Sequence, residues 1–112
     1  MSYTKIEHAL ESVLPEAVYK VQAPIEDADG NPITRYLVWT PTGEREVTAE
    51  GAAIARIGIA VVTAATQNEE DPLPQQVRAA LRAARIAVAE DVRSYDDDMA
   101  TYYVDIPVEV LL

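Results

Sequence analysis

Residues 51–66, GAAIARIGIAVVTAAT, decide the fold of this chain. Arg56 is the only charged residue in the run. Read with a period of two, the run divides between two faces. One holds Ala53, Ala55, Ile57, Ile59, Val61, Thr63 and Ala65, and the other holds Arg56, Gly58, Ala60, Val62 and Ala64. Abundant alanine would permit a helix, but the glycines and the β-branched cluster disfavour one. We therefore predict a long central strand whose small-residue face accepts close neighbours.

One amphipathic helix is expected before this strand in the sequence and another after it. Residues 3–14 repeat apolar side chains at helical spacing, with Ser2 or Thr4 placed to cap the start and Pro15 to stop the helix. A second helix is expected to begin at Pro74. The two apolar stripes consist of Ile6, Ala9, Leu10 and Val13 in the first helix, and Val77, Ala80, Leu81 and Ala84 in the second.

Two strands are predicted before the central one. Residues 18–22 (VYKVQ) and 33–40 (ITRYLVWT) are rich in β-formers, and the turn-forming run 27–32 (DADGNP) lies between them. We expect the two strands to form a hairpin. Residues 41–43 (PTG) predict the next turn, and residues 45–50 lead into the central strand.

The C-terminal part has the clearest strand pattern. Residues 86–95 are expected to be extended and to lead to a hairpin tip at residues 96–98, three consecutive aspartates. Residues 102–112 then alternate between apolar and polar side chains. Pro107 lacks an N–H, so we expect an edge or a bulge at that position.

These elements predict an α+β fold in one domain, residues 1–112. The expected order is α-β-β-β-α-β-β, and the simplest packing is a mainly antiparallel sheet with both helices on one face. With 49% hydrophobic residues but no Phe and one Trp, the core must be built mostly from Ala, Val, Ile and Leu.

The composition excludes several classes of function. Nineteen acidic and nine basic residues give a net charge of −10, which argues against binding of nucleic acid or an anionic membrane. There is no cysteine, so disulfides, thiol nucleophiles and cysteine metal sites are absent. No segment resembles a signal peptide or a membrane span, and we expect a soluble intracellular protein.

Candidate catalytic and metal-binding groups are few. His8 is the only histidine, no serine lies in a glycine-rich elbow, and the four glycines form no phosphate-binding motif. Asp27, Asp29 and Asn31 resemble the start of a calcium loop, but Pro32 stands where that loop needs glycine. We predict no catalytic residues, no cofactor and no metal site, and therefore no enzyme.

The chain resembles the tail terminator (tail-completion) proteins of long-tailed phages and prophages. The resemblance covers nearly the full length and lies in RYLVW at 35–39, ARIGIAVVTAA at 55–65 and SYDDDMATYYVDIPVEV at 94–110. These stretches match a Tyr/Trp-containing strand, a long central strand, and an acidic turn followed by an aromatic-rich final strand. The family has no invariant catalytic motif, so no residue role is transferred.

The resemblance implies a homo-oligomer, usually a hexameric ring, at the head-proximal end of the tail tube. Such a ring ends tube polymerisation and joins the head, so the expected partners are further copies of the chain, the tail tube protein and a head-completion or connector protein. The protein would occur in the cytoplasm of the bacterial host during assembly and then in the virion tail. An alternative is a small acidic adaptor or inhibitor that binds a single protein partner.

Two acidic loops are candidates to line the central passage of such a ring. Negative charge there would let DNA slide without adhering. A structural alternative for the second loop is that its carboxylates complement the positive end of the following helix dipole. The candidate residues are Glu26, Asp27 and Asp29 in the first loop, and Glu69, Glu70 and Asp71 in the second.

Overall fold

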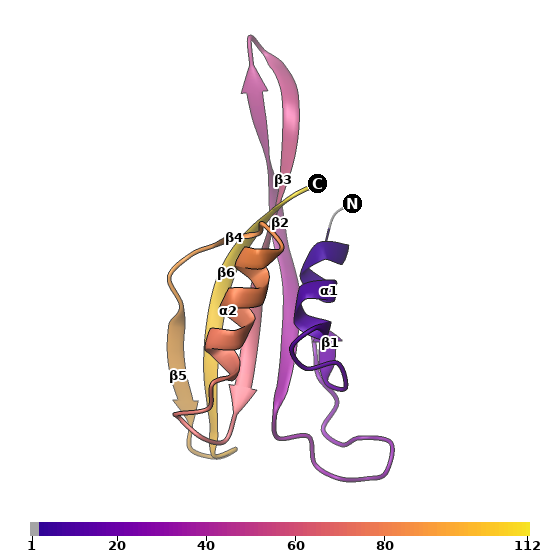
Figure 1. The fold of residues 1–112 in the computed structure, drawn as a ribbon, viewed down its shortest axis with the longest axis vertical. Coiled ribbons are helices and arrows are strands. Elements are labelled where there is room, and N and C mark those ends of the chain that lie inside the picture. The colour runs from indigo at the N-terminus through magenta and orange to yellow at the C-terminus, as the bar shows by residue number, and fades with distance from the viewer. Residues whose placement is uncertain (1–2) are drawn as a thin grey trace.

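A computed structural model describes residues 3–112 as an α+β fold in which two helices lie on one face of a six-stranded sheet (Figure 1). The sheet order is β1-β2-β3-β6-β4, and β5 also pairs with β6. The predicted fold class and element order are confirmed, with the extended segment before the last strand divided into β4 and β5. The elements are α1 (Thr4–Glu11), β1 (Val18–Lys20), β2 (Tyr36–Ala49), β3 (Ala52–Thr66), α2 (Leu73–Ala83), β4 (Ala87–Val88), β5 (Val92–Asp96) and β6 (Thr101–Leu111).

The predicted central strand is β3. It pairs with β2 along almost its whole length and with β6 from Ile57 to Thr66. Its small-residue face is buried toward the helices, whereas the β-branched face is half-exposed. Small side chains on the covered face let both helices approach the sheet closely. The buried set is Gly58, Ala60, Val62 and Ala64.

Both predicted helical stripes pack into the core. Ile6 and Leu10 of α1, and Val77 and Leu81 of α2, are fully buried. These side chains pack against the face of the sheet that the helices cover. On β6, every second residue from Val104 to Val110 points to this face and is buried. The remaining buried core residues include Leu14, Leu37, Trp39, Leu73, Ile86, Val104, Ile106, Val108 and Val110.

The helix boundaries differ slightly from expectation. α1 ends at Glu11, before the predicted end at residue 14, and within the described residues no side-chain hydrogen bond caps its start at Tyr3. Ser2, one of the two expected caps, lies outside the described residues. α2 begins at Leu73 with Pro74 in its first turn, where a missing N–H leaves no hydrogen bond unmade.

The predicted hairpin between the first two strands is wrong. β1 and β2 pair in parallel, with Val18 opposite Leu37 and Lys20 opposite Trp39. Local turn formers do not fix strand direction, and the connection 21–35 is long enough to bring the chain back to the start of its partner. Val21 begins this return with a positive φ of 70°.

The predicted turn at residues 41–43 is also wrong. β2 continues through this segment to Ala49, with a register shift between Pro41 and Gly43. Pro41 is tolerated because β1 ends opposite Trp39, so its missing N–H faces an unpaired edge. The chain instead reverses at Glu50 and Gly51, whose φ values of 53° and 80° suit a two-residue hairpin turn.

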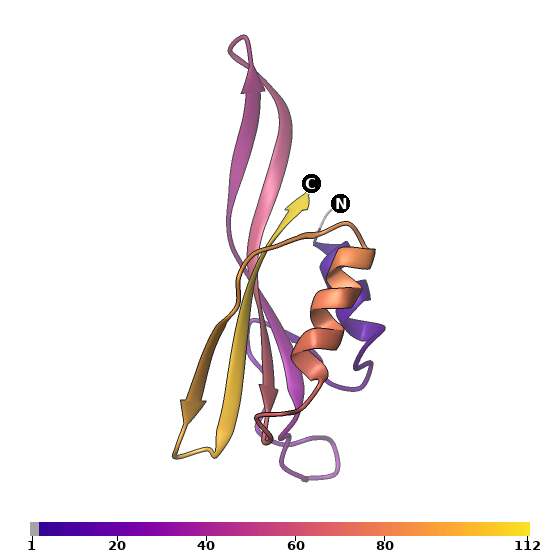
Figure 2. The same ribbon diagram turned by 60° about the vertical axis from the view of Figure 1, so that its left-hand side comes forward.

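The outer parts of β2 and β3 form a two-stranded extension that projects beyond the body of the molecule (Figure 2). We call this extension, residues 44–57, the arm. It begins where the third strand stops, because β6 ends at Leu111 opposite Ile57. The arm makes the molecule elongated, with principal extents of 53 × 27 × 24 Å.

Pro107 lies where the neighbouring strand is interrupted. β4 ends at Val88, opposite Val108, and β5 begins at Val92, opposite Asp105. The carbonyl of Pro107 accepts a hydrogen bond from Ala89 N at 2.9 Å, so its ring nitrogen faces the same gap. The expected irregularity is therefore present, but it lies in the strand beside β6.

Candidate functional site

Three acidic loops lie at one end of the molecule, and the arm projects from the other end (Figure 1). Two of them are the loops predicted from sequence, at 21–35 and 67–72. The third is the β5–β6 turn with the predicted aspartate tip. Residues 21–35, 67–72 and 96–100 contain nine acidic residues and one basic residue, so they carry −8 of the net charge of −10. The fold thus concentrates the charge at one end.

The loop at 21–35 is ordered by one of its own carboxylates. Asp27 Oδ1 accepts hydrogen bonds from the backbone N–H groups of Asp29 at 2.9 Å and Asn31 at 3.0 Å. Gly30 completes the turn with a φ of 82°. Glu26 and Asp29 are exposed. Asp27 therefore has a structural role, while Glu26 and Asp29 present their charge to solvent.

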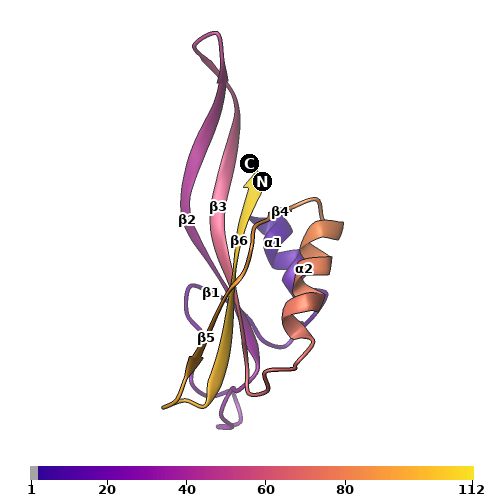
Figure 3. The ribbon, with the colours of Figure 1, turned by 90° about the vertical axis from the view of Figure 1, so that its left-hand side faces the viewer.

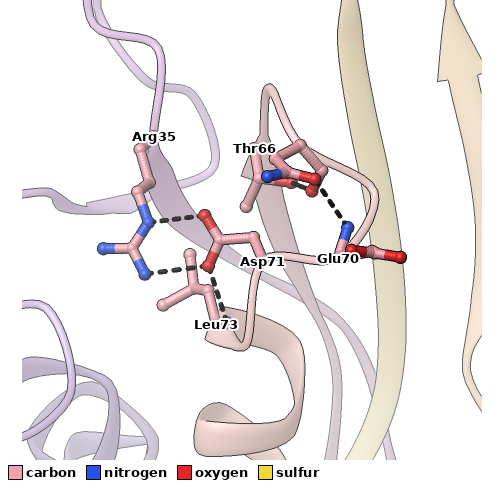
Figure 4. Close-up of polar contacts among 6 residues, drawn as sticks. Arg35, Thr66, Glu70, Asp71 and Leu73 are labelled. Carbon is pink, nitrogen blue, oxygen red and sulfur yellow. Dashed lines mark hydrogen bonds and ion pairs between the residues drawn. The ribbon is translucent and has the colours of Figure 1, made fainter.

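Asp71 joins the second acidic loop to the first (Figure 4). Its two carboxylate oxygens accept hydrogen bonds from Arg35 Nε at 2.8 Å and Nη2 at 2.9 Å. Oδ1 also accepts the backbone N–H of Leu73 at 2.9 Å, at the start of α2. The hydrogen bond from Arg35 holds the pKa of Asp71 below its ordinary value, and the carboxylate raises the pKa of Arg35. Asp71 is thus a structural member of this loop.

The rest of the second loop leaves its glutamates exposed. Thr66 Oγ1 donates to the carbonyl of Asn68 at 3.1 Å, and Asn68 Oδ1 accepts the backbone N–H of Glu70 at 2.9 Å (Figure 4). The exposed carboxylates of Glu69 and Glu70 lie just before α2. Their position also suits the helix dipole, as the structural alternative expects.

In the β5–β6 turn, as in the other two loops, one carboxylate orders the backbone while the others are exposed. Asp96 Oδ1 accepts the backbone N–H of Asp98 at 2.9 Å, which shapes the turn, while Asp97 and Asp98 are exposed.

Within residues 3–112, no group of three or more His, Asp or Glu side chains is arranged so that it could hold a metal ion. No helix in that range is long and apolar enough to cross a membrane. His8 lies exposed on α1.

An open cleft of about 260 Å³ separates the start of α2 from the β5–β6 hairpin. Tyr95 and Tyr102 are among its lining residues, with ring centroids 4.5 Å apart. Glu69 and Arg93 also line it. This arrangement offers a contact surface and contains no nucleophile held by a base.

One face of the sheet is not covered by either helix (Figure 3). Half-exposed apolar side chains, including Val38, Ile59, Val61 and Pro107, lie on this face. Tyr36 and Tyr103 both pair with Ala65, from opposite sides. Burial, with a contribution from the Tyr103 hydroxyl, raises the pKa of Tyr36 to about 12. The face therefore combines apolar area with two tyrosines.

Two sheet edges are unpaired in the described part of the chain. β1 covers β2 only from Leu37 to Trp39, so the rest of β2 has an open edge on that side. At the opposite side of the sheet, β5 pairs only with β6. Unpaired N–H and C=O groups at such edges can pair with another strand. The sequence analysis expected an edge or a bulge at Pro107 in β6 and did not identify these two edges.

No family model and no curated protein matches the sequence. The fold is similar to that of a chain in a solved structure described as "Virion of native gene transfer agent (GTA) particle", with a TM-score of 0.64. The similarity covers 97% of this chain and 89% of that chain at 13% identity. At that identity the likeness establishes a shared fold.

Proposed function

We propose that this protein is a phage tail terminator, a structural virion protein whose subunits form a hexameric ring at the head-proximal end of the tail tube. The ring ends polymerisation of the tail tube protein and presents the surface to which a head-completion or connector protein binds. Its work is assembly rather than catalysis, first in the bacterial host's cytoplasm and then in the virion tail. The observation that carries this proposal is the pair of open edges on opposite sides of the sheet.

Opposite open edges favour a closed ring. If β5 of one copy pairs with the open edge of β2 in the next, each subunit uses two different surfaces, and such head-to-tail contacts close into a ring when the rotation permits. The uncovered sheet face then runs from subunit to subunit. The arm, which begins at the same open edge of β2, is free to contact a neighbour.

The likeness to a chain of a gene transfer agent virion supports this role, because that fold is used in a phage-like particle. The charge distribution gives separate support. A ring that gathers the acidic ends of its subunits around the passage would repel DNA from its wall. Glu26, Asp29, Glu69 and Glu70 are the exposed carboxylates proposed to do this, while Asp27 and Asp71 hold their loops in place.

The test combines light scattering over a salt series with electron microscopy of the protein mixed with tail tubes. We expect monomers in dilute low-salt buffer, because subunits of charge −10 repel one another. Rings should appear at higher salt or higher concentration, and at tube ends. A protein that stays monomeric throughout and does not bind tube ends would favour the alternative, an acidic adaptor or inhibitor with one protein partner.

A pair of variants tests the edge contact itself. Val92→Lys puts a charge on β5, where Val92 is 62% exposed, and should abolish ring formation at every salt concentration. Gln76→Lys makes the same change in net charge on the exposed surface of α2 and should leave assembly as in the wild type. Equal assembly by both variants would contradict pairing through β5.

A further inference from the structure

Tyr3 contacts both strands of the arm at the point where they leave the body. Its ring lies against β3 so closely that a Cβ on Gly58 would be 2.8 Å from Tyr3 Cζ. Its hydroxyl donates a hydrogen bond to the carbonyl of Gly43 in β2 at 3.2 Å. Because Gly58 pairs with Glu44, next to Gly43, the two contacts lie at the same level of the hairpin.

The same ring is held on the body by Trp39. The Tyr3 and Trp39 rings are stacked, with centroids 5.8 Å apart and an interplanar angle of 23°. Trp39 is only 3% exposed, and Lys20 Nζ lies 5.2 Å from the centroid of its ring. Stacked aromatic pairs contribute attraction beyond the area that they bury. Tyr3 therefore connects the buried core to the root of the arm.

The root of the arm has the features of a pivot. The sheet narrows there from three strands to two, since β6 ends opposite Ile57. A register shift lies between Pro41 and Gly43, and each strand contributes one glycine, Gly43 and Gly58. Register irregularities and glycines let a strand bend, and a two-stranded ribbon is flexible by itself.

Other contacts also cross the root. Thr42 Oγ1 donates a hydrogen bond to the carbonyl of Ile59 at 3.3 Å, and the backbone N–H of Leu112 donates one to the carbonyl of Arg56 at 2.9 Å. A further side-chain contact is an exposed ion pair. Arg45 Nη2 lies 2.6 Å from Glu109 Oε1, with the two side chains 53% and 42% exposed. Exposed pairs of this kind hold a geometry weakly because water and salt screen them. The aromatic contact of Tyr3 is therefore a stronger restraint than this ion pair.

We propose that Tyr3 acts as a latch that fixes the direction of the arm, and that the arm pivots at Gly43 and Gly58 when the ring of Tyr3 is displaced. Tyr3 directly precedes α1, so a partner that moves the start of this helix would release the arm. The proposal concerns the isolated subunit and holds or fails independently of the proposed ring.

Electron–electron distance measurements between two spin labels test the latch directly. The chain has no cysteine, so Glu50→Cys at the tip of the arm and Gln76→Cys on α2 give a uniquely labelled pair. With Tyr3 present we expect one narrow distance distribution. Tyr3→Ala should shift the distribution or broaden it at least twofold, while Lys5→Ala, an exposed change in α1, should leave it unchanged.

Gly58→Ala displaces the ring without removing it. The added methyl cannot occupy the space that Tyr3 fills, so this variant should reproduce the distance distribution of Tyr3→Ala. In a Tyr3→Ala background the same Gly58→Ala change should have no further effect, because the clash is gone. If Gly58→Ala alone fails to fold, comparison of the double variant with Tyr3→Ala still tests the proposal.

Trp39, the single tryptophan, reports whether the ring has moved. Quenching of its fluorescence by acrylamide should increase severalfold in Tyr3→Ala and Gly58→Ala and remain unchanged in Lys5→Ala. An unchanged distance distribution in variants whose Trp39 has become accessible would overturn the proposal and leave Tyr3 as a packing residue only.

Discussion

The Arg35–Asp71 ion pair connects two loops that are far apart in sequence and fixes their mutual position at the acidic end. Its strength comes from geometry, because two parallel hydrogen bonds join the guanidinium and the carboxylate. The same carboxylate accepts the backbone N–H of Leu73. One residue therefore holds the first loop, the second loop and the start of α2 together.

Asp71→Asn should lower the free energy of unfolding by about 1 kcal/mol at neutral pH, since the pair is partly exposed and screened. The lowered pKa of Asp71 means that its contribution is complete above its ordinary pKa of 3.8 and is lost as the pH falls through the lowered value. Urea unfolding at neutral pH and below pH 3 should show this loss. Glu70→Gln, whose carboxylate makes no hydrogen bond, is the control; equal effects of both variants would contradict a specific role for Asp71.

The raised pKa of Tyr36 predicts that the folded protein loses stability in alkaline solution. Its pKa is raised from 10.0 to about 12 in the folded protein, so the folded state keeps a proton that the unfolded state has lost. The contribution of Tyr36 is present below pH 10 and disappears as the pH rises to about 12. In an ultraviolet titration, one of the six tyrosines should ionise late, and Tyr36→Phe should remove that late step. If all six titrate together near pH 10, the environment of Tyr36 is not as described.

These residues show where sequence reasoning stops at this scale. An acidic residue just before a helix is a recognisable capping signal, so part of the role of Asp71 could be predicted. Its pairing with Arg35 depends on loop positions that no local pattern encodes. In the sequence Gly58 marks only the small-residue face of the central strand and Tyr3 only the start of a helix, and their contact exists only once α1 packs against the sheet.

At the level of elements, periodicity predicted more than turn signals did. Both helical stripes, the central strand and the final strand were identified from side-chain alternation, because burial on one face imposes that pattern. The two errors concern connections. Turn formers at 27–32 and 41–43 mark places where a chain can bend, but tertiary pairing decides whether it reverses, crosses over or continues as a strand.

The helix–sheet packing gives a prediction for these elements. Leu10 and Leu81 are both 0% exposed, one on each helix. Replacing either with alanine should cost about 2–5 kcal/mol of unfolding free energy, because it leaves a cavity between helix and sheet. Leu111→Ala is the control, since Leu111 is 62% exposed and should change stability little. Thermally silent Leu10 and Leu81 variants would show that the helices do not pack as described.

Across the whole molecule, charge and shape are arranged along one axis. The three acidic loops occupy one end, while the arm at the other end holds Glu44, Glu46 and Glu50 together with Arg45 and Arg56, a nearly balanced set. The sequence showed two acidic loops and an acidic turn separately. Their gathering at one end follows from the sheet topology, which returns the chain to that end after β1, β3 and β5 (Figure 1).

This arrangement predicts that the position of a charge matters more than the net charge for ring assembly. In the proposed ring the acidic ends gather around the passage, and because screening at physiological salt acts beyond roughly 8 Å, repulsion between neighbouring acidic ends should contribute most to the salt requirement. Glu69→Gln with Asp98→Asn changes the net charge from −10 to −8 at the acidic end, and Glu7→Gln with Glu11→Gln makes the same change on α1.

We expect the first pair of substitutions to lower the salt concentration at which rings form by about twofold or more, and the α1 pair to lower it only slightly. Light scattering over the same salt series measures both. The four side chains are exposed and accept no hydrogen bond from residues 3–112, so neither variant should alter the fold. Equal shifts for the two variants would mean that the acidic ends do not gather around the passage, because charges at the acidic end and on α1 would then contribute alike to the repulsion between subunits.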